Sequence, residues 1–215
     1  MDIVKIIGLI IVGGLLFWLF GLKLIIKFMK KGSAPCPSSL SWLVELPIRK
    51  RYMQPVLDRV GLKPGETVLE LGPGPGAFTV DAARRLEPEG RLIAVDIQPQ
   101  MIEQVKKRVQ QAGVTNVETH VASAYDLPVE DNSVDRVFMV TVLPEIPDPV
   151  RGLKEVYRVL KPIGSFSTTE EYMDPDYPRR VTTIKWAKAA GFELEQSFGN
   201  MWLYTLNFRK KQSSA

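Results

Sequence analysis

Residues 68–76 read Val-Leu-Glu-Leu-Gly-Pro-Gly-Pro-Gly, and the rest of the chain is organised around this stretch. Thr67–Leu71 is mostly apolar and contains no breaking residue, which predicts a short strand. Residues 77–86 then carry apolar side chains at helical spacing. The predicted unit is therefore a strand, a loop and a helix. Glycines suit the loop because its backbone must adopt unusual dihedral angles and let a ligand approach closely.

The loop differs from a dinucleotide-binding loop in spacing and in charge. Its glycines follow the pattern G-x-G-x-G, at Gly72, Gly74 and Gly76, whereas a dinucleotide loop follows G-x-G-x-x-G. Pro73 and Pro75 have no N–H to donate to a pyrophosphate. Glu70 stands two residues before the first glycine, where a carboxylate repels phosphate and attracts a cation. The loop thus suits a ligand with an amino group or a sulfonium, and a nucleotide-dependent oxidoreductase is the less favoured alternative.

Asp96 is the expected partner of this loop on the next strand. Residues 91–97 (RLIAVDI) predict that strand, and Asp96 lies near its end, 20 residues after Gly76. A carboxylate at this place can accept hydrogen bonds from both hydroxyls of a ribose. The alternative is an aspartate that only prepares the turn into the helix beginning at Pro99. Together with Glu70 upstream, the pattern favours the ribose.

Four segments within residues 61–210 give the chain a resemblance to a known family. They are VLELGPGPG, AVDIQPQM, ASAYDLPVEDNSVDRVFM and EVYRVLKPIGSF, in this order. With them the chain resembles class I S-adenosylmethionine-dependent methyltransferases, and it is similar to quinone-biosynthesis and bacterial phospholipid N-methyltransferases. The resemblance implies an α/β fold with a Rossmann-like, mostly parallel sheet whose last strand is antiparallel. It also implies S-adenosyl-L-methionine as the cofactor.

The resemblance further implies which residues bind the cofactor: Glu70, Gly72, Gly74, Gly76, Asp96, Ile97, Ser123, Ala124 and Tyr125. Relatives have an acidic residue at the place of Ser123, where it accepts a hydrogen bond from the adenine amino group, and a hydroxyl is a weaker partner. The Ala124 N–H and the Tyr125 ring are expected to meet the adenine. Asp126 is the alternative partner for the amino group.

Two glutamates are the candidate catalytic residues. Glu145 follows the predicted strand 134–140 and Glu170 follows the predicted strand 165–169. Both therefore lie at the carboxyl ends of parallel strands, where such sheets bind ligands. A carboxylate there can orient an amine or take a proton, whereas the alternative for Glu145 is an exposed loop residue. Because neighbours on a strand point to opposite sides, at least one of Glu170 and Glu171 should face the pocket.

Other side chains fit structural roles. Methyl transfer depends mainly on positioning, and a general base is needed only when the acceptor must lose a proton. The sequence has no ligand spacing typical of a zinc or iron site and nothing that resembles a Ser-His-Asp arrangement. Its only histidine, His120, is expected to lean toward solvent from the predicted strand 117–122. Asp148 before Pro149 is predicted to cap a helix.

Composition excludes some partners and compartments. The formal net charge of +4 is modest and the core has no long basic run, so nucleic acid is not an expected partner. The one cysteine, Cys36, excludes an intramolecular disulfide and fits a reducing compartment. The oligomeric state is left open.

The N-terminal region predicts a membrane anchor. Residues 3–22 are apolar apart from Lys5, and 20 residues of helix span about 30 Å, the thickness of a bilayer core. Four lysines follow, Lys23, Lys27, Lys30 and Lys31, so the positive-inside rule places the next domain in the cytoplasm. A cleaved signal peptide is the alternative, but no small-x-small cleavage site follows the apolar run directly.

The sequence thus divides into four parts. Residues 1–31 form the transmembrane anchor with its basic flank, 32–60 a linker and substrate-covering helices, 61–210 the methyltransferase domain, and 211–215 a tail. Tyr52 is a candidate pocket residue. The expected function is a single-pass membrane methyltransferase acting on a lipid or another hydrophobic small molecule, such as a quinone-like ring or a phospholipid headgroup. The alternatives are a non-catalytic S-adenosylmethionine-binding membrane module and a methyltransferase of a soluble small molecule.

Overall fold

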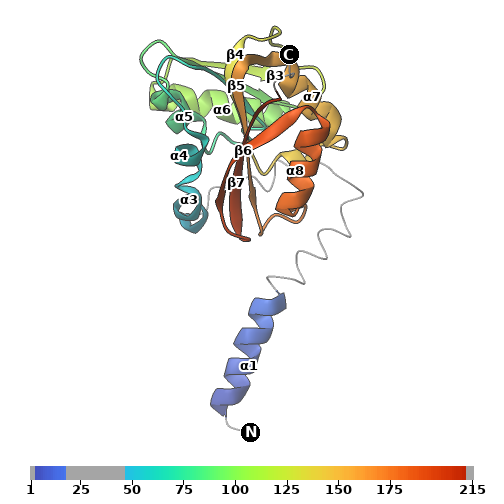
Figure 1. The fold of residues 1–215 in the computed structure, drawn as a ribbon. Helices are drawn as coiled ribbons and strands as arrows, with labels where there is room; N and C mark the ends of the chain where they lie inside the picture. Colours follow the sequence, from blue (N-terminus) through green and yellow to red (C-terminus); the bar gives the residue numbers. More distant parts are fainter. Residues whose placement is uncertain (1–2, 18–46, 212–215) are drawn as a thin grey trace.

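A sheet lies at the centre of the protein in a computed structural model that describes residues 3–17 and 47–211 (Figure 1). In this described part the sheet has seven strands, in the order β3-β2-β1-β4-β5-β7-β6. The strands are β1 Thr67–Leu71, β2 Arg91–Asp96, β3 Val117–Val121, β4 Val134–Val140, β5 Leu160–Glu171, β6 Phe192–Gly199 and β7 Leu203–Lys210. β3 lies at one edge of the sheet.

Most strands of the sheet run in one direction. β1 pairs in parallel with β2 and β4, β2 with β3, and β4 with β5. β7 runs antiparallel to both of its neighbours, β5 and β6. This confirms the predicted Rossmann-like, mostly parallel α/β sheet with an antiparallel last strand. It also brings the carboxyl ends of β1, β2, β4 and β5 to one edge, where the candidate site residues lie.

Helices cover both faces of the sheet. The helices near the sheet are α3 Pro47–Met53, α4 Val56–Val60, α5 Thr79–Arg85, α6 Pro99–Ala112, α7 Pro149–Val159 and α8 Arg180–Ala189, with the 3-10 helix η3 Leu143–Glu145; the N-terminal helix α1 Ile3–Leu16 is not one of them. Figure 1 shows α3, α4 and α5 on one side of the sheet and α8 on the other. Strand side chains alternate between the two faces, so Val68 and Phe138 pack with α4 and α5, whereas Leu69 and Val137 pack with α7 and α8.

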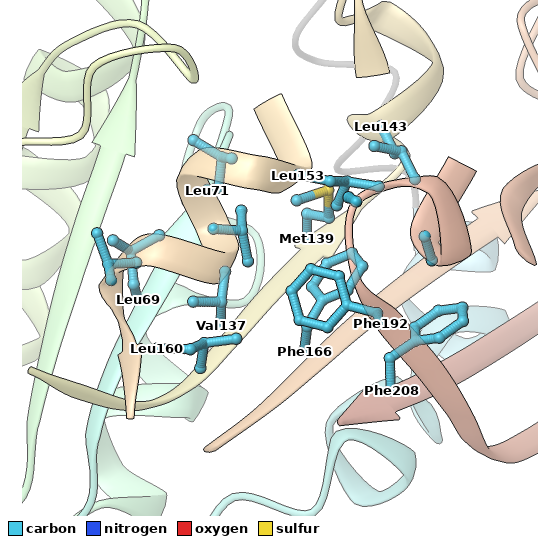
Figure 2. Close-up of a cluster of buried hydrophobic side chains, with 14 of the residues drawn as sticks. Leu69, Leu71, Val137, Met139, Leu143, Leu153, Leu160, Phe166, Phe192 and Phe208 are labelled. Atoms are coloured by element: carbon cyan, nitrogen blue, oxygen red, sulfur yellow. The ribbon is translucent and has the colours of Figure 1, made fainter. Parts of the chain in front are cut away.

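The core on the α7 and α8 face holds β5 and β7 together. Figure 2 shows Phe166, Phe192 and Phe208 in this core. The Phe166 ring centroid lies 5.4 Å from that of Phe192 and 5.6 Å from that of Phe208. All three rings are buried, and each contributes about 2–3 kcal/mol through the apolar surface it removes from water. The three rings thereby join β5, β6 and β7 on this face.

β5 is longer than the predicted strand 165–169. It begins at Leu160, which pairs with Val134, and the register then shifts. At its other end it includes Glu170 and Glu171, which both pair with β7. Two consecutive glutamates gave no strand signal in the sequence, and it is the long-range pairing with β7 that keeps them extended.

The predicted membrane anchor is described only in its first part. α1 covers it from Ile3 to Leu16, and the side chains of Ile3 and Ile10 are 74% and 68% exposed. Across residues 3–17 and 47–211, no helix is long and apolar enough to cross a membrane. Residues 18–46, which include the end of the predicted span, its lysine flank and the linker, lie outside the described residues. The predicted transmembrane helix is therefore not found in the described structure.

Candidate active site

The loop after β1 requires glycine for two reasons. Gly72, Gly74 and Gly76 have φ angles of 70°, 55° and 83°, in the left-handed region that side chains disfavour. A Cβ added to Gly72 would also lie 2.5 Å from Cγ2 of Val142, just after β4. The loop thus packs directly against the end of β4. This confirms the unusual backbone that the sequence predicted.

Glu70 is buried at the end of β1, with 2% of its surface exposed. Its Oε2 accepts a 2.6 Å hydrogen bond from Oγ1 of Thr79 at the start of α5. Burial raises the pKa of Glu70 to about 7; the Asp96 charge acts in the same direction, and the Thr79 hydrogen bond opposes both. Glu70 therefore joins β1 to α5 directly beneath the glycine loop.

Asp96 joins the glycine loop to the end of β2. Its Oδ2 accepts a 3.2 Å hydrogen bond from Gly74 N–H, and its Oδ1 accepts a 2.9 Å bond from Gln98 N–H. Burial raises the pKa of Asp96, and hydrogen bonds from backbone N–H groups oppose the shift. The bond from Gln98 N–H fits the alternative in which Asp96 only prepares the turn into the next helix. The bond from Gly74 N–H lies outside that turn, because it comes from the glycine loop. Ile97, the next residue, is 56% exposed, and its contact with a cofactor stays a prediction.

The loop after β3 lies beside Asp96. Ala122 N–H donates a 3.0 Å hydrogen bond to the Asp96 carbonyl oxygen. Ser123 Oγ accepts a 3.2 Å bond from Tyr125 N–H, which closes a local turn. Asp126 is exposed and its N–H donates to the Ser123 carbonyl oxygen. The loop is thus next to the predicted ribose site, while its contacts with adenine stay predictions.

The ring of Tyr125 is held by the first turn of α7. Its hydroxyl oxygen accepts a 2.8 Å hydrogen bond from Asp148 N–H, and the Arg151 guanidinium carbon lies 4.5 Å from the ring centroid. Oδ1 of Asp148 in turn accepts a 3.0 Å bond from Arg151 N–H. This confirms that Asp148 is a helix cap, and it shows that Tyr125 has a fixed position.

Glu145 and Glu170 interact electrostatically at the ends of β4 and β5. Glu170 is fully buried, its Oε1 accepts a 2.8 Å bond from Thr168 Oγ1, and its Oε2 has no hydrogen-bond partner among the described residues. Burial raises the pKa of Glu170 well above its usual range. The charges of Asp174, Glu145 and Glu171 raise it further. Glu145, half-buried in η3, is therefore near Glu170.

Glu171 points to the opposite face of β5. Its Oε1 lies 2.6 Å from Nη2 and 2.7 Å from Nε of Arg49 on α3. Burial raises the pKa of Tyr52, also on α3, and the Glu171 charge raises it further. The ion pair fixes α3 at the carboxyl edge of the sheet. It also confirms that the two neighbouring glutamates face opposite sides.

Thr141, directly after β4, was missed in the sequence. Its φ is 56°, an unusual conformation for a β-branched residue, which costs about 1–3 kcal/mol. Thr141 N–H donates a 2.8 Å hydrogen bond to the Thr169 carbonyl oxygen, and Val142 follows with its contact to the glycine loop. Backbone strain of this kind gathers at functional sites. A threonine at a strand end gives no sequence signal for it.

His120 lies on the edge strand β3, where its Nε2 is 2.7 Å from Oε1 of Glu118. Its side chain is 30% exposed. In residues 3–17 and 47–211, no three His, Cys, Asp or Glu side chains are grouped so that they could hold a metal ion.

The sheet order, the glycine loop after β1 and the carboxylate at the end of β2 together define a Rossmann-like methyltransferase. A family model described as a methyltransferase domain matches residues 62–201, so the chain belongs to this family. Family and fold imply S-adenosylmethionine as the cofactor, which confirms the class and the cofactor predicted from the sequence. The oxidoreductase alternative is thereby set aside.

Individual relatives agree with this class. The chain is 32% identical over 129 residues to the ubiquinone/menaquinone biosynthesis C-methyltransferase of Enterobacter sp., which covers 60% of this chain and 51% of that protein. It is 35% identical over 120 residues to the arsenite methyltransferase of Halobacterium salinarum, covering 56% and 31%. The chain thus spans about half the length of these curated relatives or less. An S-adenosylmethionine-dependent methyltransferase structure from Aquifex aeolicus shares the fold, with a TM-score of 0.75, 23% identity, and coverage of 81% and 98%.

Proposed function

We propose that this protein is a membrane-anchored S-adenosylmethionine-dependent methyltransferase that acts on a lipid or another hydrophobic small molecule, either a phospholipid headgroup or a quinone-like ring. The observation that carries the proposal is the meeting of two sets of side chains at one edge of the sheet. Asp96 and the glycine loop lie at the ends of β2 and β1, and Glu145 and Glu170 lie after β4 and at the end of β5. Val142 packs against the glycine loop and so joins the two sets.

The residues present fit the cofactor. A Cβ added to Gly74 would meet no described atom within 4 Å, so the loop is open to a ligand there. In the proposal Asp96 binds the ribose, while Glu70 and the glycine loop bind the amino-acid end. Residues 123–125 bind the adenine. The cofactor supplies a methyl group on a sulfonium, and the protein contributes binding and orientation.

Glu145 and Glu170 act on the acceptor in this proposal. They orient it and, where it must lose a proton, accept that proton. Glu170 suits this task because burial raises its pKa, and a carboxylate with a raised pKa holds a proton better. α3, which carries Tyr52, is fixed at the same edge by the ion pair between Arg49 and Glu171, and in this proposal it covers the acceptor site from the other face of β5.

Sequence and exposure support the membrane anchor. Residues 3–22 are apolar apart from Lys5, and the side chains of Ile3 and Ile10 in α1 are exposed. The lysines that follow favour a single-pass topology with the enzyme domain in the cytoplasm. The native protein should stay with membranes after alkaline carbonate washing. Recovery of the full-length chain in the soluble fraction would contradict the anchor.

The ubiquinone/menaquinone biosynthesis relative supports a hydrophobic small-molecule acceptor. The arsenite methyltransferase relative would instead suggest arsenite. Trivalent arsenic is a soft centre that prefers several thiol ligands, and this sequence contains one cysteine, Cys36. The arsenite assignment is therefore disfavoured here. A non-catalytic cofactor-binding membrane module and a methyltransferase of a soluble small molecule are the alternatives that the test must separate.

The test incubates native membranes with the full-length protein and methyl-labelled S-adenosylmethionine, and then identifies the labelled molecule. We expect the label in a membrane lipid, with loss of labelling in the Asp96→Ala variant at limiting donor concentration. Cofactor binding without any labelled product would favour the non-catalytic module. Label confined to water-soluble products would favour a soluble acceptor.

A further inference from the structure

Four aromatic side chains form a row beside Glu170. The ring centroids of Trp202 and Tyr172 are 4.9 Å apart, those of Tyr172 and Tyr177 5.4 Å, and those of Tyr177 and Tyr204 5.6 Å. The row leads from Trp202, which is 42% exposed, to Tyr204, which is fully buried and pairs in register with Glu170. Edge-to-face packing fixes the rings. The row therefore connects the surface with a buried carboxylate.

The hydroxyl groups of the two inner tyrosines donate to the protein backbone. Tyr177 OH donates a 2.6 Å hydrogen bond to the Met201 carbonyl oxygen, and Tyr204 OH donates a 2.9 Å bond to that of Pro178. At Tyr177 and Tyr204 a ligand would thus meet the ring rather than a phenolic donor. At the inner end it meets Oε2 of Glu170, which is buried and has no partner in the described part of the chain. Such an atom marks a place for a hydrogen-bond donor of a ligand.

The charges that act on the pKa of Glu170 are those of neighbouring carboxylates. The carboxylates of Asp174, Glu145 and Glu171 all disfavour its ionisation. Arg49 pairs with Glu171 on the other face of β5, and the Arg180 guanidinium carbon lies 5.3 Å from the Tyr204 ring centroid at the inner end of the row. A positively charged ligand would relieve the repulsion between these carboxylates.

From this arrangement we propose that the methyl acceptor is an amine, which binds as a cation along the aromatic row and brings its nitrogen to Glu170. Aromatic ring faces attract cations, and a buried carboxylate accepts a strong charge-assisted hydrogen bond from an ammonium. The inference rests on the proposed function, because it names the acceptor class of the same site. The amine of a lipid headgroup and a free amine share this chemistry, and the experiment below separates them.

Methylation of an amine requires a neutral nitrogen. Glu170 takes one proton from the ammonium, which leaves a lone pair on nitrogen. That lone pair forms the new nitrogen–carbon bond while the carbon–sulfur bond breaks and its electron pair stays on sulfur. The positive charge passes from sulfur to nitrogen, and Glu170 later releases its proton to water. Burial supports this role because it raises the pKa of Glu170 and so strengthens the base.

A hydroquinone ring fits this site less well. It becomes nucleophilic as negative charge develops on its oxygen and ring, and that charge would lie beside the carboxylates of Glu145, Glu170 and Asp174. The same carboxylates stabilise the positive charge that develops on an amine nitrogen. The sign of the local charge therefore favours nitrogen.

The test uses the full-length protein in vesicles with methyl-labelled S-adenosylmethionine and three acceptors. These are phosphatidylethanolamine in the vesicles, glycerophosphoethanolamine in solution, and an isoprenoid hydroquinone in the vesicles. We expect an amine to be labelled at least about tenfold faster than the hydroquinone, and the faster amine identifies its source as lipid or free. Glu170→Gln should slow amine methylation about 100-fold or more. Glu118→Gln, which changes an exposed carboxylate on β3, is the matched control and should keep the wild-type rate.

Binding is measured separately, so that a folding defect is not mistaken for a chemical one. Tetramethylammonium, which cannot be methylated, should compete with the amine, and Trp202→Leu should weaken this inhibition about fivefold. Both variants should bind the methyl donor with wild-type affinity. Label in the hydroquinone alone, or an unchanged amine rate in Glu170→Gln, would overturn the inference and leave the methyltransferase function in place. Donor binding without label in any acceptor would instead overturn the proposed function, and this inference with it.

Discussion

The carboxyl edge of the sheet has two halves that are built differently. In the donor half, at the ends of β1, β2 and β3, the carboxylates of Glu70 and Asp96 accept hydrogen bonds from residues of the same half. In the acceptor half, at the ends of β4, β5 and β7, Glu170 keeps a buried oxygen without a described partner. Thr141 holds a left-handed backbone there. The carboxylates of the donor half are thus satisfied by the protein itself, whereas the acceptor half keeps a buried carboxylate oxygen that no described residue satisfies.

Gly72→Ala should have the largest effect, because it breaks the contact between the two halves. The new Cβ would lie 2.5 Å from the Val142 side chain at a φ of 70°. Overpacking and backbone strain together should lower the free energy of unfolding by about 2–4 kcal/mol. Gly74→Ala is the control, since its Cβ meets no described atom within 4 Å and only its φ of 55° is unfavourable, at about 1 kcal/mol. Urea unfolding measures the free energy of unfolding of both variants. An equal loss of stability in the two would show that the contact with Val142 does not hold the loop.

The pH dependence of stability tests the burial of Glu70 in the donor half. The pKa of Glu70 is raised from 4.5 to about 7 in the folded protein. Its stabilising contribution is therefore complete below the unfolded pKa and is lost as the pH rises through 7, on the order of 2–3 kcal/mol in all. Glu70→Gln cannot titrate, so its stability relative to the wild type should increase between about pH 5 and pH 8.

Urea unfolding at the two pH values measures this change. Glu130→Gln, at an exposed position before β4, serves as the control. The contrary result is that the stability of Glu70→Gln relative to the wild type is the same at both pH values. That result would mean that the pKa of Glu70 is not raised in the folded protein.

Asp96→Ala should weaken donor binding. It removes charge-assisted hydrogen bonds worth about 1.5–3 kcal/mol, so the affinity for S-adenosylmethionine should fall roughly 10- to 100-fold. Asp81→Ala, at an exposed position in the first turn of α5, is the control. Isothermal titration gives both dissociation constants. An unchanged affinity for S-adenosylmethionine in a folded variant would mean that Asp96 only stabilises the turn with Gln98 and does not bind the donor.

Deletion of residues 1–32 should have the smallest effect on the donor half. The affinity for S-adenosylmethionine should not change, because the proposed cofactor residues all lie within residues 67–126. Methylation of an acceptor in vesicles should fall steeply, whereas methylation of a short-chain soluble analogue should survive, since the anchor raises the effective concentration only at the membrane. Equal losses on both acceptors, or no loss in vesicles, would mean that the anchor serves location or assembly.

The donor half could be predicted because its signals are local in the sequence. The bounds of β1 and the glycines with positive φ each follow from a few adjacent residues. Asp96 followed from its distance to the glycine loop. The hydrogen bond from Gly74 to Asp96 was not predicted, because it depends on how the loop folds back over β2.

The acceptor half could be predicted only in part, because it is assembled from distant segments. Glu145 and Glu170 were found from their places at strand ends. The ion pair between Arg49 and Glu171 joins residues 122 positions apart, and the aromatic row needs β7 beside β5. The length of β5 and the strain at Thr141 likewise arise from tertiary pairing, which overrides local preference.

The division of work between the halves is tested most directly by measuring donor affinity and turnover separately in Asp96→Ala and Glu170→Gln. We expect one variant to lose mainly donor affinity and the other to lose mainly turnover. Asp96→Ala should weaken S-adenosylmethionine binding 10- to 100-fold and regain much of its turnover at saturating donor. Glu170→Gln should bind the donor within about twofold of the wild type and lose turnover at every donor concentration. A Glu170→Gln variant that keeps full turnover, or that loses as much donor affinity as Asp96→Ala, would contradict the account.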